Sequence, residues 1–314
     1  MSNTDPTPPR KGLFNALWTP VLPDGSIDRA SLRHHIEYLR GCGIDGLMVL
    51  GSTGEFTRLS IAAQKEIISA ANEYSGSMFV VVNTSSTRLE QVIDLAAHAK
   101  QAGAHGVAIM PPYFFRLKAA DIREFILRAT EKIELPVCLY NYPEVTGNRI
   151  DPDVIADLTE QANIFGLKQS GAEFDYHHEL AALAKEKNFT LFSAADKRLP
   201  EAFKIGARGH IGGLANMIPE IMKALYDACE AGDESQIATP LYLMSEVIDV
   251  ISKVPFPFDV AAGMEARGFN PGHPKTVLSA ESQATYRSAV GACRALYSKW
   301  ELPNVEEAAC AAHA

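Results

Sequence analysis

Short apolar runs recur along the first two thirds of the chain, and longer stretches with a helical pattern separate them. The stretch 89–103 is the clearest helix, because its apolar residues repeat every three or four positions and Gly103 ends it. Strands that alternate with helices predict βαβ units and a parallel sheet. The expected strands are residues 13–18, 46–50, 78–82, 106–110, 136–140, 164–168, 190–192 and 209–213.

The number of these units favours a closed barrel. Eight of them fit within residues 12–220, a length typical of a (β/α)8 TIM barrel. A doubly wound open sheet is the alternative, but it usually carries a GxGxxG turn after its first strand, and none occurs here. We therefore predict an α/β fold, a (β/α)8 TIM barrel with a C-terminal helical extension over residues 221–302. Residues 1–11 are expected to be a disordered leader and residues 303–314 a flexible tail.

Charge and composition exclude some classes of function. The formal net charge is −9 at pH 7, which argues against nucleic-acid binding but not against a small anionic substrate. No apolar stretch reaches the roughly 18 residues that a membrane span needs. The cysteines are odd in number and form no CxxC pair, which predicts reduced thiols and a cytoplasmic protein. They are Cys42, Cys138, Cys229, Cys293 and Cys310.

Two pairs of adjacent histidines are the only hint of a metal site. They are His34 with His35, and His177 with His178. Neighbours in a helix do not share a face, so we expect these side chains on solvated helix faces and no metal.

Polar residues follow several expected strands, where the catalytic groups of a barrel lie. They are Ser52, Thr53 and Glu55; Tyr113; Tyr140, Asn141 and Tyr142; and Lys168 and Ser170. Asn141 and Tyr142 are interpreted as structural residues. Glu55 also has a structural interpretation, in which it only ties down its loop.

Lys168 is unusual because it ends an apolar strand. A lysine that points into a barrel is desolvated, which lowers its pKa and allows it to attack a carbonyl and form a Schiff base. A lysine that reaches solvent or pairs with a carboxylate explains the position equally well.

Two further groups have both a chemical and a structural interpretation. Tyr140 is placed to shuttle protons for a nearby amine, although an aromatic plug of the barrel is the favoured interpretation of this residue alone. Ser52 and Thr53 occupy a glycine-flanked turn that suits a carboxylate or phosphate, or else they cap a helix.

Six motifs in order resemble the dihydrodipicolinate synthase / N-acetylneuraminate lyase superfamily of class I, Schiff-base pyruvate aldolases. The resemblance covers residues 12–300 approximately, and the motifs together are specific for the superfamily but not for the substrate. They are LWTPVLPDGSID (17–28), GSTGE (51–55), PPYFF (111–115), YNYP (140–143), GLKQSG (166–171) and GARGHIGGLAN (206–216).

The resemblance implies a mechanism and an assembly. Lys168 would form the Schiff base with C2 of a 2-keto acid, Tyr140 would be the acid/base, and Ser52 and Thr53 would hold the carboxylate. Ser170 and Ile211 are also expected at the substrate. The covalent imine makes a cofactor unnecessary, and a cytoplasmic homotetramer is expected.

Three departures argue against the lysine-pathway synthase. Such synthases carry an arginine where this chain has Val145, which has no donor for a carboxylate. They use a tyrosine hydroxyl where this chain has Phe114, and they usually read GTTGE rather than GSTGE.

The stretch after the seventh strand bears on the substrate. Asp196 matches the aspartate with which N-acetylneuraminate lyases hold a polyhydroxy tail, whereas Lys197 replaces their glutamate. We therefore expect Lys197, with Arg198 beside it, to favour a second anionic group on the substrate.

The prediction is a lyase, an aldolase that releases pyruvate from a 2-keto acid or condenses pyruvate with an aldehyde. The alternatives are a 2-keto-3-deoxy sugar-acid dehydratase, the disfavoured 4-hydroxy-tetrahydrodipicolinate synthase, and a catalytically silent keto-acid-binding protein.

Overall fold

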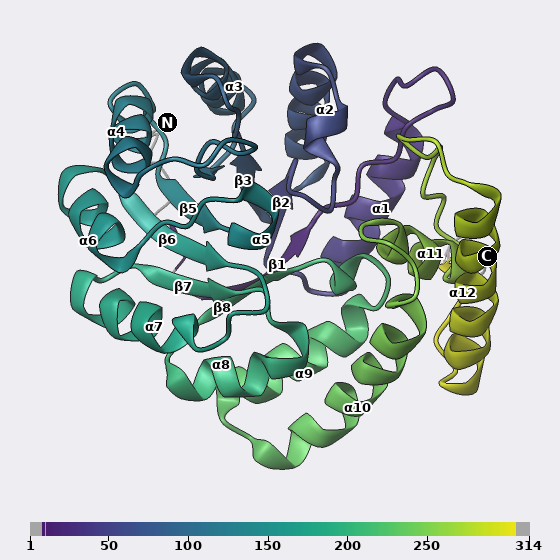
Figure 1. Cartoon of the computed structure of the whole chain (residues 1–314). Coiled ribbons are helices and arrows are strands. Elements are labelled where there is room, and N and C mark those ends of the chain that lie inside the picture. The colour runs from purple at the N-terminus through teal and green to yellow at the C-terminus, as the bar shows by residue number, and fades with distance from the viewer. Residues whose placement is uncertain (1–7, 10, 306–314) are drawn as a thin grey trace.

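Eight parallel strands form a closed barrel in the order of the sequence, with helices around it (Figure 1). The structure is a computed structural model that describes residues 8–9 and 11–305. The strands are β1 (Gly12–Ala16), β2 (Gly46–Val49), β3 (Phe79–Asn83), β4 (Gly106–Ile109), β5 (Val137–Asn141), β6 (Ile164–Gln169), β7 (Thr190–Ser193) and β8 (Gly209–Gly212). The predicted fold class is confirmed, and each expected strand overlaps an observed one.

Helices join successive strands and continue beyond the barrel. Those of the barrel are α1 (Arg29–Gly41), α2 (Ile61–Tyr74), α3 (Leu89–Gln101), α4 (Ala119–Thr130), α5 (Pro143–Thr146), α6 (Pro152–Gln161), α7 (Tyr176–Lys187) and α8 (Leu199–Ile205). Those that follow β8 are α9 (Pro219–Ala231), α10 (Glu234–Ile251), α11 (Phe258–Ala266) and α12 (Ala280–Lys299). In Figure 1, α11 and α12 lie beside the α1 side of the barrel.

The hydrophobic pattern did not predict α11. Its residues are apolar on nearly every side, since all but Asp259 and Glu265 are buried, so no polar face marks the helical period. Gly263 lies inside it against Met217, and a Cβ at this glycine would clash with the Met217 sulfur. The glycine therefore allows close packing here rather than ending the helix.

The structure describes only part of the predicted leader and of the predicted tail. Outside the described residues lie residues 1–7 and 10 of the leader and residues 306–314 of the tail, which include Cys310. Val305, within the predicted tail, is 1% exposed and its N–H donates to Arg267 O at 3.0 Å. Val305 therefore packs on the extension, whereas Pro303, at the predicted start of the tail, is exposed.

Four phenylalanine rings fill one layer of the barrel interior. They come from β1, β3, β6 and β7, and their centroids lie 5.4–6.4 Å apart. They are Phe14, Phe79, Phe165 and Phe192. Glycines on neighbouring strands make room for them, since a Cβ at Gly209 would clash with Phe192 and one at Gly46 would lie 2.9 Å from Phe14. This layer is a packed core, so chemistry is confined to the carboxyl ends of the strands.

Candidate functional site

Lys168 and Tyr140 lie side by side on adjacent strands. They are partners in the register of β6 and β5, and they are 3% and 0% exposed. The Lys168 Nζ lies 4.2 Å from the centroid of the Tyr140 ring and 3.6 Å from Met48 Sδ, across the barrel on β2. Lys168 forms no ion pair with any residue that the structure describes. It neither reaches solvent nor meets a carboxylate, so the structural alternative raised for this lysine is wrong.

The Tyr140 hydroxyl reaches the glycine-flanked turn after β2. It lies 2.9 Å from Ser52 Oγ, a hydrogen-bond distance at which either oxygen can donate. The amine, the phenol and the serine hydroxyl thus converge from three different segments. A keto acid whose carbonyl carbon reaches Lys168 would therefore be close to the hydroxyls of both Tyr140 and Ser52.

The backbone of the turn is held in an uncommon conformation. Leu50 and Glu55, on either side of it, have φ values of 61° and 57°, in the left-handed region that residues with a Cβ rarely adopt. A Cβ at Gly54 would lie 3.0 Å from Leu17 O, so this glycine lets the turn approach the end of β1. Backbone strain of this kind persists where the surrounding structure over-determines it, often at a functional site.

Helix capping does not explain Ser52 and Thr53. The next α-helix, α2, begins at Ile61, and its cap is Ser60, whose side chain accepts a hydrogen bond from Ala63 N. Thr53 is 4% exposed and Ser52 is half-buried. The two hydroxyls are therefore available for another role.

Glu55 ties the turn to two cations. Its carboxylate is buried, accepts a hydrogen bond from Lys275 Nζ at 3.0 Å and forms an ion pair with Arg58. The interpretation that Glu55 tethers its loop agrees with these contacts.

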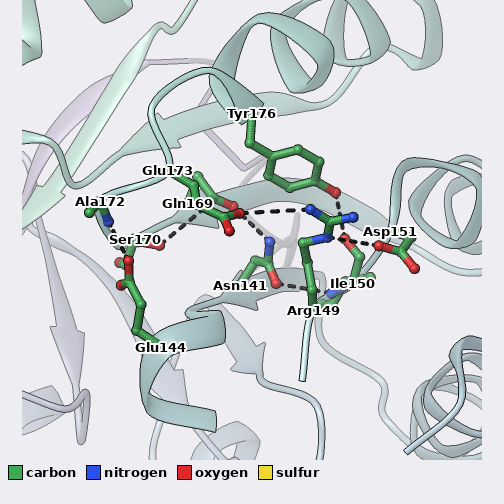
Figure 2. A network of polar contacts seen from close by, with 10 residues as sticks. All are labelled: Asn141, Glu144, Arg149, Ile150, Asp151, Gln169, Ser170, Ala172, Glu173 and Tyr176. Carbon is green, nitrogen blue, oxygen red and sulfur yellow. Dashed lines mark hydrogen bonds and ion pairs between the residues drawn. The ribbon is translucent and has the colours of Figure 1, made fainter. Parts of the chain in front are cut away.

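Figure 2 shows the polar network that supports the ends of β5 and β6. Asn141 Nδ2 donates to Gln169 Oε1 at 2.7 Å, and Asn141 Oδ1 accepts from Ile150 N at 3.0 Å. Glu144 on α5 accepts a hydrogen bond from Ala172 N at 2.6 Å, which joins the loops after the two strands. These bonds agree with a structural role for Asn141. They also fix the strand ends that carry Tyr140 and Lys168.

Asn216 organises the opposite side of the barrel mouth, and the sequence did not single it out. Its Oδ1 accepts from Asn15 Nδ2 at 2.8 Å and from Trp18 N at 3.0 Å, and its Nδ2 donates to Ala16 O at 2.8 Å. It also donates to Gly213 O at 2.8 Å, so one buried side chain joins β1 to the segment after β8. The signal available was the polar residue that ends the otherwise apolar motif GGLAN.

The residues predicted for the distal part of the substrate are more scattered. Asp196 Oδ1 lies 3.1 Å from Nε2 of the buried His210. Lys197 is half-exposed and donates to Asp249 on α10 at 2.6 Å, while Arg198 donates to Glu201 at 2.7 Å. Both cations therefore have a carboxylate partner already, and the anionic-tail hypothesis stays a prediction.

Other predicted or overlooked groups surround this region. Ile211 is 1% exposed on β8, paired with Phe14, and Ser170 is 6% exposed, with its N–H donating to Asn141 O. Asp259 on α11 was not singled out from the sequence. Burial raises the pKa of the Asp259 carboxyl to about 6, and the nearby charge of Asp196 adds to that rise.

The expectation that all four paired histidines lie on solvated faces is wrong for two of them. His35 and His177 are 2% and 0% exposed, because each pair places one ring toward the barrel and one outward. His35 Nε2 lies 3.0 Å from Asn216 Oδ1, and burial lowers the pKa of both rings to about 4. Neutral imidazoles packed in the core explain them. Among residues 8–9 and 11–305, no group of three or more His, Cys, Asp or Glu side chains is arranged to hold a metal ion.

Comparisons with known proteins identify the family of this chain. The model of the dihydrodipicolinate synthetase family matches residues 9–293. A 4-hydroxy-tetrahydrodipicolinate synthase of Methanococcoides burtonii is 30% identical over 87% of this chain and 94% of its own length. An uncharacterized DapA-like lyase of Pyrococcus horikoshii is 32% identical over 82% of this chain and 91% of its own length.

Solved structures give the same result. YagE, a prophage protein of the dihydrodipicolinic acid synthase family from E. coli K12, crystallised in complex with pyruvate, superposes with a TM-score of 0.84 at 25% identity. The alignment covers 91% of this chain and 98% of YagE. The dihydrodipicolinate synthase of Aquifex aeolicus gives a TM-score of 0.85 at 25% identity, over 94% of this chain and 99% of its own. The chain therefore belongs to the dihydrodipicolinate synthetase family and is a lyase of that family.

Proposed function

We propose that this lyase forms an imine between Lys168 and C2 of a 2-keto acid, and that it releases pyruvate by retro-aldol cleavage or condenses pyruvate with an aldehyde. The observation that carries the proposal is a buried lysine amine with no carboxylate partner among the described residues, beside a tyrosine that is bonded to a serine. The pyruvate bound to YagE supports pyruvate as the keto acid.

The proposed chemistry follows from these positions. The amine attacks C2, and loss of water leaves an iminium ion whose nitrogen accepts electrons. In cleavage, a base removes the proton of the C4 hydroxyl, the C3–C4 bond breaks and its electron pair forms the enamine of pyruvate. Protonation at C3 and hydrolysis then release pyruvate and free Lys168. Tyr140, hydrogen-bonded to Ser52, is the group proposed to move these protons.

The carboxylate of the keto acid is assigned to the turn after β2. Ser52 and Thr53 offer hydroxyl donors there, and charge-assisted hydrogen bonds to a carboxylate are the strong ones. We propose that no cofactor is needed, since the iminium ion is itself the electron sink.

Borohydride trapping tests the proposal. Incubation with pyruvate and sodium borohydride is expected to reduce the imine and leave one pyruvyl-derived adduct on Lys168, located by peptide mass spectrometry. Pyruvate held in D2O should also exchange its methyl protons, because the enamine forms without an acceptor aldehyde. Absence of both signals, under conditions where a known Schiff-base aldolase gives them, would overturn the proposal.

Tyr140→Phe is expected to slow the methyl-proton exchange of pyruvate by roughly 10²–10⁴-fold, the usual contribution of a positioned acid/base group. The ring that packs on Lys168 stays in this variant and only the hydroxyl is lost. Tyr142→Phe is the matched control, since its ring lies 6.4 Å from that of Tyr140 and its loss of a hydroxyl should change the rate less than about threefold. Equal exchange rates in Tyr140→Phe and Tyr142→Phe would show that the Tyr140 hydroxyl is not the acid/base group.

The synthase reaction is the second candidate, because the Methanococcoides relative carries that name. It requires condensation of pyruvate with aspartate semialdehyde, whose carboxylate needs a cationic or hydrogen-bonding partner. Val145, at the position of the expected arginine, is 56% exposed and offers neither. Product formation from pyruvate and aspartate semialdehyde, at a rate above that with sugar-derived aldehydes, would favour the synthase.

We also propose that the protein assembles as a homotetramer. Phe114 and Phe115 are 85% and 72% exposed, and their rings lie 4.8 Å apart in the loop after β4. Neighbouring exposed aromatic rings of this kind mark interaction surfaces. A monomer in sedimentation-velocity runs at micromolar concentration would contradict this assembly.

A cytoplasmic location is part of the same proposal. The four described cysteines are free thiols, as expected in a reducing compartment. No described helix is long and apolar enough to cross a membrane.

A further inference from the structure

The segment between α11 and α12 lies across the loop that follows β1. We name residues 270–278 the strap. Trp18 Nε1 donates to Pro271 O at 2.7 Å, and His273 N donates to Val21 O at 2.7 Å. A Cβ at Gly272, which has a φ of 78°, would lie 2.6 Å from Val21 N, so the backbones are in close contact. The strap is thus hydrogen-bonded to the loop after β1 at both Trp18 and Val21.

Lys275 extends from the strap into the protein. Its side chain is 3% exposed, and its ammonium lies 4.5 Å from the centroid of the Trp18 ring. Burial lowers the pKa of Lys275, and the charge of Glu55 opposes that shift. A lysine is rarely buried to this extent unless its charge is paired.

The partner of Lys275 is the last residue of the turn proposed to bind the substrate carboxylate. Glu55 Oε1 accepts from Lys275 Nζ at 3.0 Å, and the Glu55 side chain is 2% exposed. Glu55 also has the left-handed backbone conformation described above, and its N–H donates to Ser52 O at 3.1 Å. The ion pair therefore acts on a residue whose backbone is bonded directly to Ser52.

We infer that Lys275 is a positioning residue: through Glu55 it holds the turn 51–55 in the conformation that presents Ser52 and Thr53 to the keto-acid carboxylate. The inference rests on the proposed function. It assigns the C-terminal extension a part in the active site, although the barrel alone carries the groups proposed to touch the substrate. Two observations support the inference. Both charges of the pair are buried. Glu55 also has an uncommon φ, a conformation that needs stabilisation from its surroundings.

The test separates KM from kcat for the methyl-proton exchange of pyruvate in D2O. Lys275→Met keeps a long apolar stem under Trp18. Among the described residues it leaves Glu55 with the half-exposed Arg58 as its one cation. We expect KM for pyruvate to rise between about 10- and 100-fold, since weaker hydrogen bonds from Ser52 and Thr53 to a charged carboxylate have effects of this size. The value of kcat should change less than KM does, because Lys168 and Tyr140 stay on their strands and only the hydrogen bond between Tyr140 and Ser52 is disturbed.

Two further variants distinguish positioning from a general loss of stability. Lys275→Arg restores a cation for Glu55 and is expected to recover most of the affinity. Glu55→Gln combined with Lys275→Met should raise KM by less than the product of the two single effects, because both changes remove the Glu55–Lys275 pair.

The matched control breaks a different ion pair, in which the arginine is buried and the glutamate is partly exposed. Arg267 Nη2 lies 2.9 Å from Glu220 Oε1 between α11 and α9. Glu220→Gln should lower the melting temperature and leave KM unchanged. An unchanged KM in Lys275→Met, or an equal rise of KM in Glu220→Gln, would overturn the inference. Loss of exchange and of borohydride trapping in the wild-type protein would instead overturn the proposed function.

Discussion

Lys168→Met is expected to abolish methyl-proton exchange of pyruvate, with a loss of roughly 10⁴-fold or more, because no other described lysine lies beside Tyr140. Methionine fills a similar volume next to Met48 but has no amine to attack C2. The exchange rate, followed by proton NMR, measures the loss without knowledge of the natural acceptor. Borohydride and pyruvate should leave this variant unmodified at the site.

Lys168→Arg tests whether the reaction needs a positive charge at this position or a nucleophilic amine. A guanidinium keeps the positive charge but stays protonated at any useful pH, so it cannot form the imine. Both variants should therefore be inactive, whereas Lys185→Met, at an exposed position on α7, should exchange at the wild-type rate. Activity in Lys168→Arg would mean that the lysine contributes charge rather than a nucleophile.

Asn216→Ala is expected to lower the free energy of unfolding by roughly 4 kcal/mol or more, a large share of the stability of an ordinary domain. The change leaves the N–H of Trp18 and the carbonyls of Ala16 and Gly213 buried without their present partner. A buried group without a partner costs about 1–3 kcal/mol. Urea unfolding followed by circular dichroism measures the difference.

Asn72→Ala provides the comparison. Asn72 is half-buried on α2 and donates one hydrogen bond, to Ile68 O, one helical turn earlier. Its loss should cost no more than about 1 kcal/mol, the net value of a single hydrogen bond. If the two variants unfold at the same urea concentration, the Asn216 network contributes no more to stability than one helix-surface bond.

Local patterns in the chain were enough to predict the barrel. Strand-length apolar runs separated by amphipathic stretches repeat eight times, and such periodicity depends on near neighbours. The same patterns placed Lys168 and Tyr140 at the ends of strands. They failed for α11, which is buried on most sides and shows no polar face, and for His35 and His177, because adjacent positions on a helix turn to different faces.

Contacts between distant segments could not be predicted in this way. The register that pairs Tyr140 with Lys168 follows from the parallel pairing of β5 with β6, and the bond from Tyr140 to Ser52 joins residues 88 positions apart. The Glu55–Lys275 pair spans 220 positions. Residue types and spacings indicate which groups can take part in chemistry, whereas packing decides which charges are buried, which are paired and which amine is left without a carboxylate. For this chain, hydrophobic periodicity sets the order of strands and helices, and the folding of remote segments onto one barrel mouth creates the candidate site.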